Sequence, residues 1–331
     1  MKKIIVTLAL LAWMMPASSR AQQSEPLRLV ATISLDNVQG RIDHFSADLE
    51  GGRLFMSALG NNTVEVFDLR TGKRIHTVPG LHEPQGVYYV PEVNKLFVAN
   101  GEGGSVEIFD GSSFKLLGEV KFSDDADNLR YDSAARQIYV GYGEGGLGII
   151  DAARNQLLHD IKLEGHPESF QLEKSGPRIF INIPNAREIA VVDRVKRAVV
   201  GRWPMDGDRA NFPMALDEPG KRLFIVCRHP AAMMVLDTSS GRLVSTLPCV
   251  GDADDVWYDA VLKQIYISGG EGFLSVIAQQ NANHYEALAK IPTAPGARTS
   301  FFAPQLHRLY LAVPRRGTQS AQLRVYEVQT R

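Results

Sequence analysis

Hydrophobic and polar positions alternate along most of this chain, and the alternation is organised around a repeated aromatic residue. Each copy follows a leucine or isoleucine, and consecutive copies are 41 to 44 residues apart: Phe55, Phe97, Tyr139, Phe180, Phe224, Tyr266 and Tyr310. Alternation with a period of two predicts half-buried strands. A repeat of about 40–45 residues built from such strands is typical of a propeller blade. The chain is therefore predicted to be all-β: a seven-bladed β-propeller with four antiparallel strands per blade.

Two further regularities define the order of strands within a blade. The strand after the aromatic one ends in an aspartate in five repeats: Asp68, Asp110, Asp151, Asp193 and Asp237. Aspartate stabilises a following turn by accepting hydrogen bonds from the downstream backbone. The fourth strand follows in six repeats, and its seventh copy is the segment 27–33 near the start of the chain. We therefore expect this N-terminal strand to join the last blade and close the ring.

The second repeat carries segments that can be compared with a known family. It reads EPQGV at 83–87, KLFVAN at 95–100 and GSV at 104–106, followed by Phe109 and Asp110. These segments resemble the YVTN-type 40-residue repeat of exported YncE-like propellers, and the resemblance extends over essentially the whole mature chain. It implies the propeller fold and an exported binding scaffold, but no catalytic motif that could be transferred to this sequence.

The N-terminus has the pattern of a secretory signal peptide. Lys2 and Lys3 precede an apolar run of 12 residues at 4–15, and small residues then lead to Ala21. The run is shorter than the roughly 20 residues that a transmembrane helix needs. We expect residues 1–21 to be cleaved, residues 22–331 to form one propeller domain, and the mature protein to be periplasmic or secreted.

The global charge of the chain disfavours nucleic acid as a partner but excludes no other class of partner. The formal net charge is −1 and 22% of residues are charged, so no strongly basic surface is indicated for nucleic acid. The sequence also contains no GxSxG, HExxH, Walker or CxxCH motif. We therefore predict a monomeric binding scaffold without a transmembrane segment, whose partner is a small polar ligand or a protein.

The predicted starts of the inner strands are rich in ionisable and amide side chains. In a propeller these positions surround the mouth of the central channel, where ligands usually bind. We predict a ligand-binding face formed by Asp43, His44, Asp127, Asn128, Glu168, Asn211, Asp254, Asp255 and Arg298. The tripeptide Asp-Ala-Asp occurs at 125–127 and at 252–254, three blades apart and so on opposite sides of the channel.

These carboxylates have more than one interpretation. They could cap strands and hydrate the channel, hold a divalent metal, or act as an acid–base pair. A metal would be held by Asp127, Glu168, Asp254 and His44. In that case the alternative function is a metal-assisted lyase or lactonase-like hydrolase, with His44 as its base.

Basic residues are expected on other sectors of the same face, so that the face is divided by sign. These residues are Arg187, Arg209, Arg228, Arg298, Arg315 and Arg316. A divided face suits a zwitterionic or polar ligand, or a protein, better than a nucleic acid duplex, because its acidic sector would repel phosphates.

The two cysteines, Cys227 and Cys249, are predicted to lie near the same face of blade five. Two strand spacings separate them by roughly 9–10 Å, which exceeds the usual Cα separation of a disulfide. Bending of the loop could close this gap, so a disulfide and two separate thiols both remain open.

Overall fold

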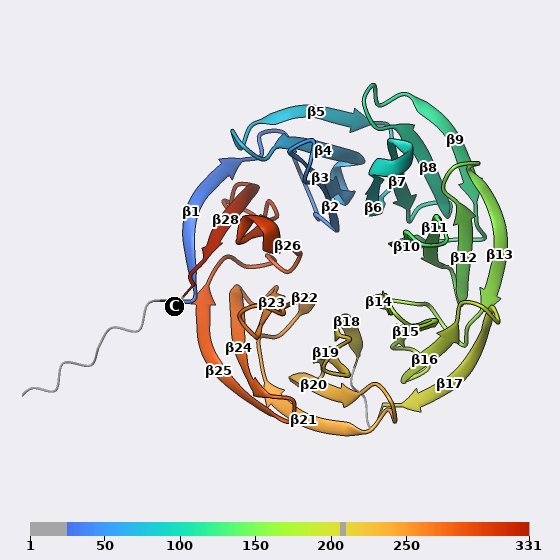
Figure 1. The fold of residues 1–331 in the computed structure, drawn as a ribbon. Coiled ribbons are helices and arrows are strands. Elements are labelled where there is room, and N and C mark those ends of the chain that lie inside the picture. Colours follow the sequence, from blue (N-terminus) through green and yellow to red (C-terminus); the bar gives the residue numbers. More distant parts are fainter. Residues whose placement is uncertain (1–24, 206–209, 331) are drawn as a thin grey trace, which may run out of the picture.

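The computed structural model describes residues 25–205 and 210–330, and it confirms the predicted fold class. Seven four-stranded antiparallel sheets are arranged in a ring around a central channel (Figure 1). Three short 3₁₀ helices lie in turns: η1 (Leu59–Asn61), η2 (Pro91–Val93) and η3 (Pro304–Leu306). No helix in the described ranges is long and apolar enough to cross a membrane. The predicted signal peptide, residues 1–21, lies outside the described residues.

Each blade begins with an inner strand beside the channel and continues outward. The inner strands are β2 (Phe45–Asp48), β6 (Pro84–Val90), β10 (Ala126–Asp132), β14 (Phe170–Leu172), β18 (Asn211–Asp217), β22 (Ala253–Asp259) and β26 (Ser300–Ala303). The second strands, which carry the repeated aromatic residue, are β3 (Arg53–Ala58), β7 (Lys95–Asn100), β11 (Gln137–Tyr142), β15 (Arg178–Ile183), β19 (Arg222–Arg228), β23 (Gln264–Gly269) and β27 (Arg308–Val313).

The outer half of each blade completes the sheet. The third strands are β4 (Thr63–Asp68), β8 (Ser105–Asp110), β12 (Gly146–Asp151), β16 (Glu188–Asp193), β20 (Ala231–Asp237), β24 (Phe273–Asn281) and β28 (Gln322–Val328). The outermost strands are β5 (Arg74–Pro79), β9 (Leu116–Lys121), β13 (Gln156–Lys162), β17 (Ala198–Pro204), β21 (Leu243–Pro248), β25 (His284–Pro292) and β1 (Leu27–Ser34).

The repeated aromatic residues pack between blades, as the alternation predicted. Phe55 is fully buried and stacks on Tyr89 of the next blade, with ring centroids 5.5 Å apart. Phe224 makes the equivalent contact with Tyr258 at 5.1 Å. Large flat side chains exclude much apolar surface from water and fill the layer between neighbouring sheets. This inter-blade packing fixes the inner strands, and hence the channel, in place.

The aspartates that end the third strands cap turns as expected. The Asp68 carboxylate accepts hydrogen bonds from the backbone N–H of Thr71 at 2.6 Å and from its hydroxyl at 2.8 Å. Asp237 accepts from the backbone N–H groups of Ser239 and Ser240, both at 3.0 Å. The regular turns keep the outer strands in register with the rest of each blade.

The ring is closed by the N-terminal strand, also as predicted. β1 runs antiparallel to β28, from the pair Leu27–Val328 to the pair Ser34–Gln322, with one register irregularity after Leu29. Figure 1 shows the two ends of the described chain meeting in this blade, with β1 outside β28. Hydrogen bonds between the ends of the chain therefore hold the first and last blades together.

Candidate functional site

The inner strands begin with irregularities that change which side chains face the channel. β10 and β22 each shift register within their first four residues. A bulge of this kind leaves a residue unpaired and redirects its side chain. In β10, Asp127 and Asn128 both line a small cavity at the channel mouth. In β22, Asp254 lines that cavity, whereas Asp255 lines a larger pocket deeper in the channel.

Ionisable side chains, most of them in ion pairs, fill the channel mouth, and we call this group the mouth cluster. It consists of Arg41, Asp43, His44, Asp127, His166, Glu168, Arg228, Asp254 and Arg298. Arg41 lies 2.7 Å from the buried carboxylate of Asp43. The carboxylate of Asp254 contacts Arg228 at 2.5 Å and Arg298 at 3.1 Å.

This arrangement corrects the expectation of a face divided by sign. Arg228 and Arg298 were predicted to form a separate basic sector, but they pair with Asp254 across neighbouring blades. Arg209 lies outside the described residues. Opposite charges therefore alternate around the mouth and neutralise one another locally.

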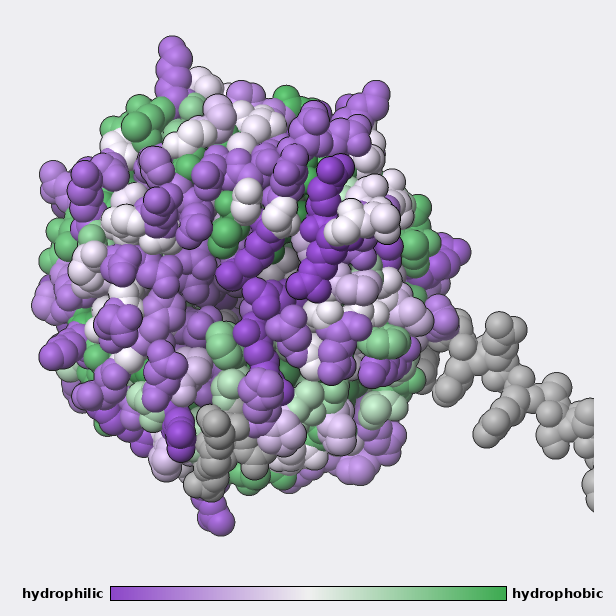
Figure 2. All heavy atoms as spheres, turned by 180° about the vertical axis from the view of Figure 1, so that it is seen from behind, coloured by the Kyte–Doolittle hydropathy of each residue, from purple (hydrophilic) through white to green (hydrophobic). Residues whose placement is uncertain are grey.

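The mouth cluster leaves little space between its side chains. It encloses a cavity of about 20 Å³, which is enough for about one water molecule. Figure 2 shows the molecule from behind the view of Figure 1, with hydrophilic side chains around a hollow near the middle of that face. The predicted ligand-binding residues thus close the mouth more than they form a roomy site.

Burial and the neighbouring charges set unusual protonation states here. Burial opposes the charge of His166, but Asp127 outweighs it and raises the pKa of His166 to about 9. Burial, and then the charge of Asp127, raises the pKa of Glu168 to about 8. At neutral pH His166 is therefore a cation, and Glu168 is mostly a neutral acid.

His44 joins the mouth cluster to the deeper pocket. Its Nε2 atom lies 3.6 Å from Asp43 and 3.8 Å from Asp127, and its Nδ1 atom lies 3.9 Å from Asp255. Burial lowers the pKa of His44, but the three carboxylates outweigh burial and raise it above its ordinary value. A raised pKa favours the protonated form of His44, which weighs against a role as base, because a base must be available in its neutral form.

The predicted metal site is not assembled. Within residues 25–205 and 210–330, no three His, Cys, Asp or Glu side chains are arranged so that they could hold a metal ion. The predicted ligands Asp127, Glu168, Asp254 and His44 do lie around the mouth cavity. However, Asp254 is occupied by two guanidinium groups and Asp127 faces two histidines. Both carboxylates therefore already have partners within the protein.

Asn211 was predicted to bind ligand, but its side chain serves the contact between blades. It is fully buried and donates to the side-chain oxygen of Asn182 at 2.9 Å and to the backbone oxygen of Glu188 at 3.3 Å. Asn128 does line the mouth cavity, where it donates to Asp127 at 3.2 Å. The two asparagines thus differ in role although both stand near the start of an inner strand.

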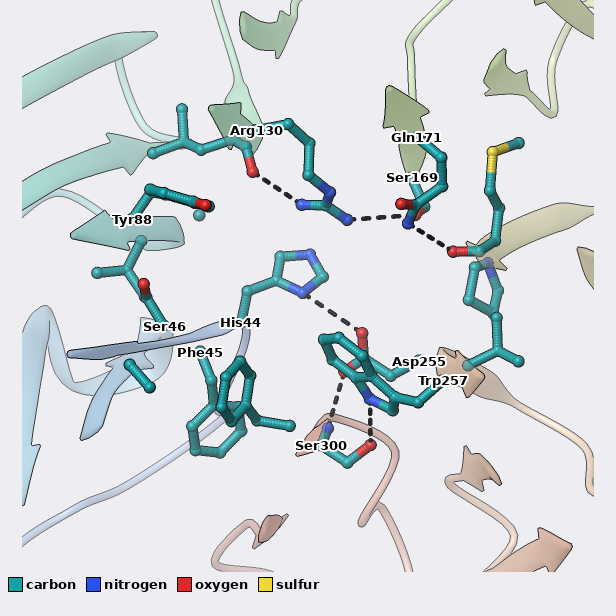
Figure 3. Close-up of a pocket in the computed structure, with 18 of the residues that line it drawn as sticks. His44, Phe45, Ser46, Tyr88, Arg130, Ser169, Gln171, Asp255, Trp257 and Ser300 are labelled. Carbon is teal, nitrogen blue, oxygen red and sulfur yellow. Dashed lines mark hydrogen bonds and ion pairs between the residues drawn. The ribbon is translucent and has the colours of Figure 1, made fainter. Parts of the chain in front are cut away.

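The larger cavity lies in the channel beyond the mouth cluster. It has a volume of about 320 Å³ and is lined by the inner strands of all seven blades. Figure 3 shows Arg130 and Tyr88 on one side of this channel pocket, Trp257 and Ser300 on the other, and His44 pointing between them. Concave sites of this size that combine apolar walls with a few convergent polar groups are typical of small-molecule binding.

Hydrogen bonds hold several walls of the channel pocket in place. The Trp257 indole N–H donates to the Ser300 hydroxyl at 3.1 Å, and the Ser300 backbone N–H donates to Asp255 at 2.7 Å. The Gln171 side chain donates to the Met214 backbone oxygen at 2.9 Å. Burial raises the pKa of Asp255 to about 7, against the opposing influence of His44 and the Ser300 N–H. The pocket is therefore largely preformed.

Among the predicted residues only His44 and Asp255 line the channel pocket. The sequence analysis missed the others that define it: Tyr88, Arg130, Ser169, Gln171, Trp257, Ser300 and Phe301. Five of the seven share a position within an inner strand, whereas Ser169 precedes β14 and Ser300 is the first residue of β26. An arginine or a tryptophan at such a position is an available clue, since side chains there face the channel.

The structure does not join Cys227 and Cys249, both of which it describes, by a disulfide bond. Cys227 pairs with Ala232 in β20, and Ala232 pairs in turn with Pro248 of β21. A whole strand therefore lies between the two cysteines, and of the two alternatives left open by the sequence the structure has the one without a disulfide between them. The Cys227 sulfur lies 3.6 Å from that of Met234. Burial raises the pKa of Cys249 to about 12, so its thiol stays protonated and poorly reactive.

Comparison with known proteins places the chain by fold. No protein-family model and no curated protein matches it. A chain of Kuenenia stuttgartiensis hydrazine synthase is similar, with a TM-score of 0.72 and 16% identity over 85% of this chain and 94% of that chain. A chain in a crystal structure of the mitotic checkpoint complex has a TM-score of 0.78 and 12% identity, over 100% of this chain and 99% of that chain. At these identities the likeness establishes the β-propeller fold.

Proposed function

We propose that this protein is an exported propeller of the YVTN-repeat type that binds a small molecule in its channel pocket. The observation that carries the proposal is the 320 Å³ pocket, which is lined by the inner strands of all seven blades and in which polar and aromatic side chains from six of them converge. A binding scaffold was the first function predicted from the sequence. Because the mouth residues leave little space, we place the proposed binding site in the channel pocket and not at the mouth.

The mouth cluster supports this assignment because it is nearly closed. Its cavity of about 20 Å³ cannot take a molecule much larger than water. A ligand of the channel pocket would thus reach it from the opposite face, and the cluster would form the floor of the site. The paired charges of such a floor resist displacement, because separating buried partners leaves uncompensated charges.

The metal-assisted lyase or hydrolase has less support. It requires carboxylates that are available to a cation, whereas Asp254 and Asp43 already pair with arginines. It also requires a neutral histidine base, whereas carboxylates surround His44.

The proposal is tested by screening the mature protein against a library of small polar molecules with ligand-observed NMR. Gln171→Trp places a large side chain in the channel pocket and is expected to abolish the hits. Gln280→Trp is the matched control, because Gln280 is exposed near the outer end of β24, and it should keep them. Hits that bind wild type and Gln171→Trp equally would contradict a site in the channel pocket.

Export is tested separately. The full-length chain expressed in a bacterium with a periplasm is expected to yield a periplasmic protein that begins at Gln22, as read by N-terminal sequencing. Cytoplasmic protein that retains residues 1–21 would contradict export.

A further inference from the structure

Arg130 reaches into the channel pocket from β10. The arginines of the mouth cluster each contact a carboxylate, at 2.7 Å for Arg41, 2.5 Å for Arg228 and 3.1 Å for Arg298. Arg130 differs, because it forms no ion pair with any residue that the structure describes. Its guanidinium donates to the Leu129 backbone oxygen at 2.8 Å and, over a longer distance of 3.4 Å, to the Ser169 hydroxyl.

The charge of Arg130 is poorly compensated by the protein. Burial lowers the pKa of Arg130, and the more distant charges of Asp255 and Asp127 only partly oppose this. Burial raises the pKa of Asp255 to about 7, so this carboxyl is only partly ionised at neutral pH, and it lies 3.9 Å from the His44 ring. A positive charge in such surroundings gains most from an anion placed directly against it.

A second polar group lies on the same side of the pocket. The Tyr88 hydroxyl has no hydrogen-bond partner within residues 25–205 and 210–330, and Figure 3 shows Tyr88 beside Arg130 at the cavity. Burial raises the pKa of Tyr88, so the hydroxyl keeps its proton and can donate it in a hydrogen bond. A guanidinium and a hydroxyl together offer three or more donors to one ligand group.

The opposite side of the pocket is aromatic. Trp257 and Phe301 meet edge to face with centroids 5.5 Å apart, and both line the cavity with Pro213 and Met214. The Trp257 N–H is already bonded to Ser300, so this wall offers mainly apolar surface. Such a wall favours an apolar or aromatic body and offers no partner to a second charged group.

We propose that the channel pocket binds a small organic monocarboxylate, with its carboxylate on Arg130 and Tyr88 and its apolar body against Trp257 and Phe301. This inference rests on the proposed function and specifies the class of ligand. A planar carboxylate matches the fork of a guanidinium and accepts two parallel hydrogen bonds. A phosphate dianion fits less well, because one unpaired arginine balances one charge and Asp255 would repel the second.

The experiment uses three probes of similar shape: phenylacetate, phenylacetamide and benzylphosphonate. Titration calorimetry on the mature wild-type protein at pH 7 compares their affinities directly and needs no variant. Phenylacetate is expected to bind at least about tenfold more tightly than the amide, since a hydrogen bond to a charged group contributes more than a neutral one. The phosphonate is expected to bind no more tightly than phenylacetate.

Variants then assign the carboxylate to its partners. Arg130→Met should weaken phenylacetate binding by about tenfold or more and leave phenylacetamide nearly unchanged. Tyr88→Phe, which keeps the ring and removes the hydroxyl, should weaken phenylacetate binding by a few-fold. Arg136→Met is the matched control, because Arg136 is exposed on the same blade, and its affinity for phenylacetate should equal that of wild type.

The outcomes separate this inference from the proposed function. If hits from the library depend on Gln171 but phenylacetate does not bind, the carboxylate inference is overturned and the channel pocket remains a binding site. The carboxylate inference is also overturned if phenylacetamide or benzylphosphonate binds more tightly than phenylacetate, or if Arg130→Met leaves phenylacetate binding unchanged. If neither the library nor the probes bind in the pocket, the proposed function itself fails.

Discussion

The mouth cluster lies mainly just before the inner strands and the channel pocket lies along them, and the two regions compensate positive charge in different ways. In the mouth cluster Arg228 and Arg298 share the carboxylate of Asp254. In the channel pocket Arg130 has no carboxylate partner among the described residues: it donates to the Leu129 oxygen and the Ser169 hydroxyl and lies over the Phe170 ring, 5.5 Å from the ring centroid. Fully paired charges suit a part of the structure that must remain closed, whereas an unpaired charge beside a cavity suits a part that binds. The number of charged residues would not distinguish the two regions, because the difference lies in their pairing.

The largest expected effect comes from breaking the pairing in the mouth cluster. Asp254→Ala leaves two guanidinium groups without their shared partner, and we expect it to lower the free energy of unfolding by about 3 kcal/mol. Urea denaturation followed by tryptophan fluorescence measures this change. Asp252→Ala is the control, because Asp252 contacts the same arginines but its side chain is 43% exposed. It should cost less than about 1 kcal/mol, and equal losses in the two variants would contradict the account of the cluster.

A smaller effect is expected from pH, because several groups of the cluster, among them Glu168 and His166, bind protons more tightly in the folded state. The pKa of Glu168 rises from 4.5 to about 8, so the stability that its proton contributes is complete below pH 4.5 and is lost as the pH rises to 8. The pKa of His166 rises from 6.5 to about 9, so its contribution is lost between pH 6.5 and 9. The free energy of unfolding should therefore fall as the pH rises from 6.5 to 9.

Glu168→Gln sharpens this test, because glutamine is uncharged at every pH. In the variant the free energy of unfolding should fall less steeply up to pH 8, and the part of the fall that His166 causes should remain. Glu144→Gln, at an exposed glutamate in a loop, serves as the control and should follow the wild-type curve. A Glu168→Gln curve that is parallel to wild type would show that Glu168 is ionised in the folded protein at neutral pH.

The smallest expected effect on stability is that of Arg130→Met without ligand. Since Arg130 forms no ion pair within the described residues, its replacement by an apolar side chain of similar length should change the free energy of unfolding by less than about 1 kcal/mol. Arg228→Met, at a paired arginine, should cost about 3 kcal/mol. Denaturation curves for both variants make the comparison. Equal losses would mean that Arg130 is a structural residue like those of the mouth cluster.

The fold could be predicted from local patterns because each blade repeats them. Phe55 and its six equivalents fall on one buried face, Asp68 and its equivalents mark the turns, and the segment 27–33 supplies the strand missing from the last blade. Each of these features depends on sequence spacing and on the identity of a single residue. They require no knowledge of how distant loops meet.

The site could be predicted only in part, because it depends on how blades meet across the channel. The mouth residues Asp43, Asp127 and Asp254 were correctly expected to lie around one channel. The pairing of Asp254 with arginines of two other blades was not, because sequence spacing gives no distance between blades. Arg130 was missed since the register shift after Ala126 changes which residues of β10 face the channel. Strict alternation cannot anticipate that shift.

The comparison between the two regions is tested most directly by NMR of the arginine side chains. Mature protein labelled with ¹⁵N at arginine is titrated with phenylacetate, and the Nε resonances are assigned with Arg130→Met, Arg228→Met and Arg298→Met. We expect the Arg130 resonance to shift in a saturable way and the Arg228 and Arg298 resonances to keep their positions. Saturable shifts of Arg228 and Arg298, with Arg130 unchanged, would place the ligand at the mouth and contradict the account.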